Sequence, residues 1–539
     1  TRRSSDLVGE PWNAKTIADE IGYTSIATQG ICQYLRQRGT LPHAIVIGHD
    51  HRHHSHEFAQ VAAKTFLMRF PRVVLLPGCV PTPLVPAAVR CLQPTQLGVM
   101  ITASHNPAAD NGYKVYWGDG AQIRPPIDRD MLRCIEAERA EGQLWALPGA
   151  DVPADAPALQ LVLAYYRDHI KCWTEQLQLQ LPGPCPPFAY TAMHGVGLQT
   201  LLQVWEHCFG AAHRDALAVV PAQALPDPAF PTVHFPNPEE GPKALHVAMR
   251  FVEERPRRDL RFLLANDPDA DRFAVAEFNG LRWRFYTGNE VATMLGFFLM
   301  QRFQHAPLTQ YILASGVSSR YLGVVVRHFN ASSPHAPKFR FEATVGTGFK
   351  YLGARAVALC AEAGNLVLLA FEEAIGYQMG NWHFDKDGIA TLLAFTGVLR
   401  AGHAAGGDFW LDTHLEGIYR AVGQRPLEAN GYYFCQPASR IKPLMAGLPL
   451  RIAQLQQEPV AADALAITAC SDAEGMLRLE LAAAGSRGWL IFRASGTEPK
   501  LKFYSELLAA LGSDRDTWRG QVEALVQRIL QPAHNGLTR

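Results

Sequence analysis

Short apolar runs alternate with segments of helical periodicity along most of the chain. The apolar runs predict buried strands at 44–48, 73–76, 97–101, 188–193, 262–266, 273–276, 309–315, 366–370 and 489–492. Between some of these runs, apolar residues at helical spacing predict helices at 16–35, 85–92 and 158–179. Strands that alternate with helices are typical of mostly parallel sheets, so the sequence predicts an α/β fold.

The length of the chain indicates more than one domain. With 539 residues, the chain should hold three or four domains, each with its own core. A proline-rich break at 181–187 marks a domain boundary after the helix predicted at 158–179. No internal sequence repeat is obvious, but the successive strand–helix units are expected to share a topology.

Composition and charge exclude several classes of partner. Hydrophobic residues make up 48% and charged residues 19%, as in an ordinary soluble protein. The 50 basic residues balance the 50 acidic ones, so the net charge predicts no binding to nucleic acid or to a membrane surface. The 10 cysteines form no CxxC pair, which favours reduced thiols and a cytoplasmic protein.

The stretch 98–123 carries the first candidate for chemistry. The apolar run at 97–101 ends abruptly in Thr-Ala-Ser-His-Asn-Pro, residues 102–107. Ser104 therefore follows a buried strand, where its hydroxyl can be presented in a cleft. The alternative interpretation is a turn capped by serine and asparagine.

A second candidate site follows the strand predicted at 262–266. Asp267, Asp269 and Asp271 alternate along the chain, and three such carboxylates repel one another unless they are solvated or bind a cation. Hard oxygen ligands suit Mg²⁺ better than zinc. A solvated acidic turn is the alternative, whereas a calcium loop of the EF-hand type should have glycine where Arg272 stands. Acids beside an arginine at a strand end indicate phosphoryl transfer.

Five histidines between His49 and His56 form a third cluster. They invite a metal interpretation, but alternate residues of a loop do not share a face. Arg52, in the middle of the cluster, would also oppose a bound cation. The sequence therefore disfavours a metal site among these histidines.

Four motifs resemble, in order, the signature loops of the α-D-phosphohexomutases. They are TASHNP at 102–107, DPDADR at 267–272, FEEAIG at 371–376 and RASGTEP at 493–499. The resemblance extends over nearly the whole chain from about Tyr23. ITASHNP, NGYKVYW, PNPEEG and FEEAIGY are most similar to the phosphoglucomutase-2 branch, which includes phosphopentomutases and glucose-1,6-bisphosphate synthases.

The resemblance implies an architecture of four domains around one central cleft. Three similar α/β domains with mixed sheets would precede a smaller α+β domain. The expected boundaries are 1–180 with the reactive serine, 181–307 with the metal-binding loop, 308–430 with the sugar-binding loop and 431–539 with the phosphate-binding loop.

The resemblance also implies roles for the residues of the first two motifs. Ser104 would carry the phosphoryl group as phosphoserine and, together with Asp267, Asp269 and Asp271, would bind one Mg²⁺ ion. Arg272 would neutralise charge on the transferring group. Lys114 would be the proton carrier, with its pKa lowered by the metal and the arginine, and Lys350 and His105 are the other candidates.

The later motifs would bind the substrate. Glu372 and Glu373 would accept hydrogen bonds from sugar hydroxyls, and Lys350 would contact the substrate. The non-reacting phosphate would lie in a nest formed by Arg493, Ser495, Gly496, Thr497 and Lys502. Ala374 stands where the hexose-specific type has serine, which predicts relaxed selectivity between sugars.

The implied activity is interconversion of an aldose 1-phosphate and its 5- or 6-phosphate through a bisphosphate intermediate. A sugar bisphosphate would be the activator, sugar phosphates the only partners, and the protein a monomer.

The sequence departs from the family at its start, because the early Gly-Thr-Ala-Gly-Leu-Arg loop is not found. Asp50 and Arg52, however, match the element that supports the serine loop in the family. A fragment or a replaced first strand would explain this difference. A glucose-1,6-bisphosphate synthase and an inactive sugar-phosphate-binding paralogue remain alternatives.

Overall fold

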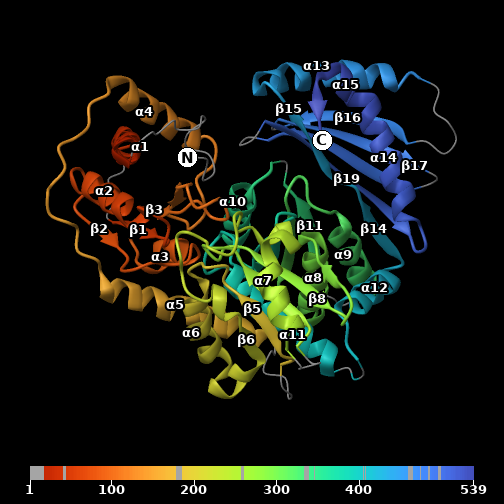
Figure 1. Ribbon diagram of the computed structural model, residues 1–539, viewed down its shortest axis with the longest axis horizontal. Helices are drawn as coiled ribbons and strands as arrows, with labels where there is room; N and C mark the ends of the chain where they lie inside the picture. Colours follow the sequence, from red (N-terminus) through yellow and green to blue (C-terminus); the bar gives the residue numbers. More distant parts are fainter. Residues whose placement is uncertain are drawn as a thin grey trace. The chain divides into compact units, whose positions relative to one another are not determined.

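The computed structural model describes most of the chain (Figure 1). The described residues are 17–39, 44–177, 185–255, 260–332, 339–344, 346–404, 406, 408–458, 465–473, 475–483, 486–495 and 499–539. Their strands form four sheets, which follow one another along the chain. In these ranges, no helix combines the length and the apolar character needed to cross a membrane.

The first sheet has the strand order β2-β1-β3-β4. β1 pairs in parallel with β2 and β3, whereas β4 is antiparallel to β3. The sheet is therefore mixed, with the three predicted strands parallel to one another. Its strands and the accompanying helices are β1 (Ile45–His49), β2 (Val73–Leu75), β3 (Leu97–Ile101), β4 (Tyr113–Trp117), α1 (Ile17–Gln37), α2 (Ser55–Leu67), α3 (Leu84–Cys91), α4 (Ile127–Glu141) and α5 (Ala156–Gln176).

Alternation along β1 and β3 divides their side chains between two faces. One face, with Ile47 and Val99, belongs to a core shared with α1, α2 and α4. On the other face, a Cβ atom at Gly98 would lie 2.6 Å from a methyl group of Val89 in α3. Glycine at this position therefore allows α3 to pack directly on the sheet.

The second sheet has the order β6-β5-β7-β8-β9. β5 pairs in parallel with β6 and β7, and β8 is antiparallel to β7. The PNPEEG segment, expected to be a rigid loop, contains a short 3-10 turn that leads directly into a helix. The elements are β5 (Phe188–Thr191), β6 (Leu217–Val219), β7 (Phe262–Asn266), β8 (Phe273–Phe278), β9 (Trp283–Phe285), α6 (Gly197–Phe209), α7 (Pro242–Glu253), α8 (Gly288–Phe303) and the 3-10 turns Ala211–Ala216, Pro221–Gln223 and Pro238–Glu240.

The third sheet has the order β11-β10-β12-β13, with β13 antiparallel to β12. All three sheets thus have the same strand order. The first strand along the chain lies between the second and the third, and the fourth strand lies on the other side of the third. The expected common topology is confirmed. The elements are β10 (Thr309–Ala314), β11 (Phe339–Ala343), β12 (Asn365–Glu372), β13 (Gly376–Gln378), α9 (Tyr321–Ser332), α10 (Phe349–Cys360) and α11 (Gly388–Ala404).

The common scheme gives three of the four motifs equivalent positions. Each motif occupies the connection from the third to the fourth strand of its sheet: the serine loop (102–112), the acid loop (267–272) and the glutamate loop (373–375). Each connection also holds one non-glycine residue with positive φ, namely Ser104 at 53°, Ala270 at 57° and Ile375 at 56°. Such backbone conformations are disfavoured and persist where the surrounding structure enforces them.

The fourth sheet has the order β16-β17-β18-β19-β15-β20, with β14 also paired to β19. It has its own apolar core beneath α13 and α14, so the α+β character predicted for this part is confirmed. The elements are α12 (Leu411–Val422), β14 (Gln424–Glu428), β15 (Gly431–Cys435), the 3-10 turn Ala438–Arg440, α13 (Ile441–Leu455), β16 (Ala466–Ala473), β17 (Met476–Ala483), β18 (Ser486–Ala494), β19 (Lys500–Ala510), α14 (Arg515–Leu530), α15 (Pro532–Asn535) and β20 (Leu537–Thr538).

By compactness the chain divides into two units. The first contains the described residues from 17 to 313, 339–340 and Gly348–Leu411, and therefore all three motif-bearing loops of the α/β sheets. The second contains the fourth sheet together with 314–332 and the described part of Phe341–Thr347. The four domain boundaries expected from the resemblance remain predictions.

Candidate active site

The serine loop is held by one buried arginine. The guanidinium of Arg52 donates hydrogen bonds to the main-chain carbonyls of Ser104 and Asn106, both at 2.6 Å. It donates two more to the carbonyls of Pro107 (2.7 Å) and Asp110 (3.1 Å). The position of Arg52 beneath the serine loop, implied by the resemblance, is confirmed.

Asp50 completes this support from the end of β1. Its carboxylate lies 3.4 Å from Nε of Arg52 and accepts hydrogen bonds from the main-chain N–H of Arg52 and the hydroxyl of Ser55. Both side chains of the ion pair are fully removed from solvent. Because a buried ion pair fixes the geometry of its partners, the loop carrying Ser104 rests on a rigid base.

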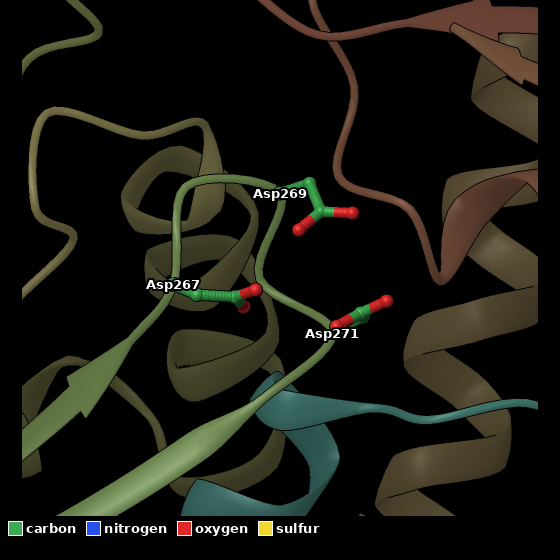
Figure 2. Close-up of side chains that lie close together, drawn as sticks. All are labelled: Asp267, Asp269 and Asp271. Carbon is green, nitrogen blue, oxygen red and sulfur yellow. The ribbon is translucent and has the colours of Figure 1, made fainter. Parts of the chain in front are cut away.

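Asp267, Asp269 and Asp271, called the acid triad below, project from the turn that joins β7 to β8 (Figure 2). All three residues are completely buried. Each residue contributes one carboxylate oxygen to a group of three oxygens that lie within 4.8 Å of one another. The alternative of a solvated acidic turn is therefore wrong, because no solvent reaches these carboxylates.

Ser104 and the acid triad meet in the structure. The hydroxyl of Ser104 donates to Oδ2 of Asp267 at 3.1 Å. Burial raises the pKa of Asp267 well above its usual range, and the neighbouring carboxylates of Asp269 and Asp271 raise it further. Two motifs separated by 163 positions in the sequence thus form one site.

The ammonium group of Lys114 lies against two members of the acid triad. Its Nζ atom donates to Asp269 at 2.7 Å and to Asp271 at 2.8 Å. Burial opposes its charge, but these two carboxylates outweigh burial and raise its pKa above the usual range. In this arrangement the shift is opposite to the expected lowering, because the nearest charges to Lys114 are negative.

The residues of the site fit a small divalent cation. Three carboxylates converge in a space without solvent, and among the described residues Oδ1 of Asp269 and Oδ1 of Asp271 have no hydrogen-bond partner. Buried acceptors without partners are strongly unfavourable unless a ligand satisfies them. An all-oxygen donor set of this kind suits Mg²⁺.

Arg272 and His105 lie beside the triad. Nε of Arg272 is 3.8 Å from Asp271 and 4.0 Å from Asp267. Burial opposes the charge of Arg272, but the carboxylates of Glu372, Asp271 and Asp267 outweigh burial and raise its pKa. His105 lies 3.4 Å from the hydroxyl of Ser104, and burial together with the charge of Arg272 keeps its pKa well below the usual value.

The glutamate loop contributes Glu372 at the end of β12. Glu372 is buried, and burial raises its pKa although Lys386 and Arg272 counteract this effect. A Cβ atom at Gly376 would lie 2.3 Å from Cδ of Lys386 and 2.8 Å from Oε1 of Glu372, so only glycine leaves room for both side chains. Glu373 and Ala374 follow and are half-buried.

Lys350 lies at the start of α10, where its Nζ atom pairs with Asp128 of α4 at 3.1 Å. This ion pair holds Lys350 against α4. Its expected contact with substrate stays a prediction.

The fourth motif lies in the second unit, at the connection from β18 to β19. Arg493 and Lys502 are register partners on these antiparallel strands, and Tyr432 of β15 is the next partner along the same row. Like charges that face one another on a sheet repel, and an anion between them removes the repulsion. Ser495 donates its N–H to the carbonyl of Lys500 at 2.8 Å. Gly496 and Thr497 lie outside the described residues.

Two stretches of the chain match family models of known proteins. Residues 13–141 match the family model "Phosphoglucomutase/phosphomannomutase, alpha/beta/alpha domain I", and residues 165–280 match domain II. The human phosphopentomutase is 34% identical over 93% of this chain and 84% of its own length. The chain belongs to the phosphoglucomutase/phosphomannomutase family.

A further relative supports the family assignment, and a solved structure shows the same fold. The human glucose 1,6-bisphosphate synthase is 32% identical over 95% of the chain and 85% of its own length. The crystal structure of a Paramecium phosphoglucomutase (parafusin) in its open form covers 99% of the chain and 96% of its own, with a TM-score of 0.70 at 18% identity. The structural likeness confirms the multi-domain α/β fold.

Lys386, which was not predicted from the sequence, is a second ammonium group in the site of this phosphomutase family member. Its Nζ atom lies 3.2 Å from Oδ2 of Asp271 and 3.6 Å from Asp385. The signal was the polar run His-Phe-Asp-Lys-Asp at 383–387, whose charged members are buried. Tyr116 and Gln122 donate to Asp385 at 2.8 and 2.9 Å and so hold this run in place.

The histidine cluster near residue 50 forms no comparable metal centre. His49 and His56 approach within 3.3 Å through ring nitrogens, and the ring of His51 packs edge-on against Phe230. Across the described ranges, the acid triad is the single group of three or more histidine, cysteine or acidic residues placed to share a metal ion.

Proposed function

We propose that this protein is a phosphosugar mutase that interconverts an aldose 1-phosphate and its 5- or 6-phosphate. The observation that carries the proposal is the hydrogen bond of 3.1 Å between the Ser104 hydroxyl and Asp267, within a buried acid triad. A hydroxyl nucleophile beside convergent acids and cationic side chains has the parts required for phosphoryl transfer. The relatives named phosphopentomutase and phosphoribomutase support this function.

Ser104 is assigned the role of phosphoryl carrier. Phosphorylated Ser104 would pass its phosphoryl group to a free substrate hydroxyl, whose proton leaves to a basic side chain. The resulting bisphosphate would return its other phosphoryl group to the Ser104 oxygen, and the product alkoxide would take a proton back. Lys114, Lys386 and His105 are the candidates for the proton carrier, because each lies against Ser104 or the acid triad.

One Mg²⁺ ion is the proposed cofactor, and Asp267, Asp269, Asp271 and the phosphorylated Ser104 would hold it. When bound, it would neutralise charge on the transferring phosphoryl group. Arg272 would add a fixed positive charge beside the triad, since its guanidinium lies within 4.0 Å of Asp267.

The substrate is proposed to be a pentose or hexose phosphate, with a sugar bisphosphate as activator. Glu372 and Glu373 would accept hydrogen bonds from sugar hydroxyls, and Lys350 would contact the substrate. Arg493, Ser495, Gly496, Thr497 and Lys502 would hold the non-reacting phosphate. The opposed positive charges of Arg493 and Lys502 support this assignment.

The protein is further proposed to be a cytoplasmic monomer. All 10 cysteines lie in the described parts of the chain and are free thiols, which supports a reducing compartment.

A bisphosphate synthase is the second candidate function. It is favoured by the 32% identity to the human glucose 1,6-bisphosphate synthase over 95% of this chain. The same serine would then accept its phosphoryl group from a separate donor and transfer it to a sugar monophosphate. The two functions differ in whether bisphosphate is regenerated or accumulates.

The test is transfer of labelled phosphate from glucose 1,6-bisphosphate to the protein, followed by peptide mapping. We expect the label on Ser104, and turnover of ribose 1-phosphate and glucose 1-phosphate with only catalytic amounts of bisphosphate. Ser104→Ala should take up no label and have no activity. Label on another residue would exclude the mechanism, and label without turnover of any sugar phosphate would favour the inactive paralogue.

A further inference from the structure

A buried threonine links the serine-loop domain to the acid triad. Thr82 lies in the Pro-Thr-Pro turn just before α3 and is completely buried. Its hydroxyl donates to Oδ2 of Asp269 at 2.5 Å, and its main-chain N–H donates to the carbonyl of Asp269 at 2.9 Å. Two separate donors of Thr82 therefore contact one residue of the triad.

The flanking prolines make this contact rigid. Pro81 and Pro83 have no main-chain N–H, so the N–H of Thr82 is the single main-chain donor of the turn. Proline also fixes its own φ and restricts the preceding residue to extended backbone. Val80 adds an anchor by donating to the carbonyl of His49 at 2.9 Å, at the end of β1. The turn is thereby pre-organised before it meets the acid loop.

The two carboxylate oxygens of Asp269 differ in their hydrogen bonding. Oδ2 accepts from Thr82 and, at 2.7 Å, from Lys114. Oδ1 is buried and has no hydrogen-bond partner among the residues that the structure describes. With Oδ2 fixed by two donors, the carboxylate cannot rotate freely, and Oδ1 is the oxygen left available for a ligand.

We propose that Thr82 is a positioning residue for the metal site, which orients Asp269 so that its Oδ1 atom is presented to the cation. Thr82 itself touches neither the cation nor the substrate. Because Thr82 belongs to the same sheet domain as Ser104, its contact also fixes the acid loop relative to the serine loop. This inference rests on the proposed assignment of Mg²⁺ to the acid triad.

The test compares the Mg²⁺ affinity of variants that distinguish the contribution of the Thr82 hydroxyl from that of the Thr82 methyl group. Thr82→Val keeps the shape and removes the hydroxyl, whereas Thr82→Ser keeps the hydroxyl. Thr65→Val is the matched control, because Thr65 is also fully buried and donates to a carbonyl within α2. Isothermal titration calorimetry with MgCl₂ alone gives the dissociation constant without any sugar phosphate, and thermal unfolding in chelator gives stability without metal.

We expect Thr82→Val to weaken Mg²⁺ binding about 10-fold to 100-fold, the usual effect of losing an outer partner of a metal ligand. Thr82→Ser should restore affinity to within about threefold of wild type, and Thr65→Val should leave it unchanged. Unchanged affinity in Thr82→Val would overturn the inference. So would equal losses in Thr82→Val and Thr65→Val, since the effect would then follow general destabilisation.

The same experiment distinguishes failure of the inference from failure of the metal assignment. If the wild-type protein itself bound no Mg²⁺ while transferring phosphate from bisphosphate to Ser104, the metal assignment and the role of Thr82 would both be wrong, and the mutase function would stand. If the wild type bound Mg²⁺ and Thr82→Val bound it equally well, only the role of Thr82 would be wrong.

Discussion

The guanidinium of Arg52 donates a hydrogen bond of 2.6 Å to the main-chain carbonyl of Ser104. Ser104 has a left-handed backbone, with φ at 53°, which an isolated serine avoids. The planar guanidinium spans four carbonyls of the serine loop, whereas an ammonium group is a point charge with no comparable fork. Arg52 thus compensates for the strain that presents the Ser104 hydroxyl.

Arg52→Lys should therefore lower activity strongly although the charge is kept. We expect at least a 10-fold loss of kcat and a decrease of about 2–4 kcal/mol in the free energy of unfolding, because buried carbonyls lose charge-assisted hydrogen bonds. Enzyme kinetics and denaturant unfolding measure the two effects. Arg129→Lys, at an exposed position of α4, is the control and should change neither. A fully active Arg52→Lys protein would show that the loop holds its conformation unaided.

Asp271→Asn should weaken Mg²⁺ binding and suppress turnover. The substitution removes one of three buried carboxylates, and two carboxylates hold a hard cation poorly. Activity measured against Mg²⁺ concentration should show a much higher requirement than in wild type. In wild type, excess chelator should abolish activity and added Mg²⁺ should restore it. Full activity in chelator would contradict the metal assignment.

Lys386→Met should reduce kcat and also lower stability, because the buried carboxylates of Asp271 and Asp385 lose one of their cations. The ammonium of Lys386 lies 3.2 Å from Asp271, so its removal takes a fixed positive charge from the site while the methionine chain fills the same space. We expect a loss of about 100-fold or more, measured in the mutase assay. Lys243→Met, at an exposed position of α7, should be fully active. A Lys386→Met protein within twofold of wild type would exclude Lys386 from the chemistry.

Ala374→Ser should shift the preference between sugars toward hexose. A serine hydroxyl could donate one hydrogen bond to a sugar hydroxyl, worth about 0.5–1.5 kcal/mol, which corresponds to roughly a threefold to tenfold change. The measurement is the ratio of kcat/KM for glucose 1-phosphate and ribose 1-phosphate in both proteins. An unchanged ratio would mean that other residues set the selectivity.

Glu506 should make the second unit less stable as pH rises. Burial raises the pKa of Glu506, although Ser319, Arg320 and Trp489 donate hydrogen bonds to it and counteract the shift. A raised folded pKa means that the folded protein binds the proton more tightly than the unfolded chain. The stabilisation is therefore complete below the usual pKa of glutamate and is lost as pH rises through the raised value.

Glu506→Gln cannot titrate and provides the comparison. Melting temperatures of the two proteins, measured at a series of pH values, should diverge above the usual glutamate pKa, with the wild type losing stability relative to the variant. Parallel curves would show that Glu506 has the same pKa in the folded and unfolded protein.

Much of the local structure could be predicted from the sequence. The strand at 97–101 matches β3, and the runs at 262–266 and 273–276 identify β7 and β8. A buried strand needs a continuous apolar run, and such a run can be recognised in the sequence without knowing which strands pair with it. Prediction was weaker at boundaries: the helix expected to end at 179 ends at Gln176, because apolar periodicity continues past its last turn.

Electrostatic surroundings could not be predicted, because they depend on residues far apart in the chain. Lys114 was expected to have a lowered pKa beside Mg²⁺ and an arginine, yet its nearest neighbours in the structure are Asp269 and Asp271. Little in the sequence indicated that Lys386 is buried, because a charged run such as 383–387 is typical of a solvated loop. Its burial became visible only in the fold.

The sequence by itself determined which residues are candidates for the chemistry, because Ser104, the acid triad and the paired glutamates lie in short motifs at the ends of apolar strands. The tertiary structure decided how they act together. Three sheets with one strand order place each of these motifs at the same connection, from the third strand to the fourth. Thr82, Lys114 and Ser104 belong to the first sheet and its connections, whereas the triad follows β7 of the second sheet, and no local pattern encodes contacts between sheets.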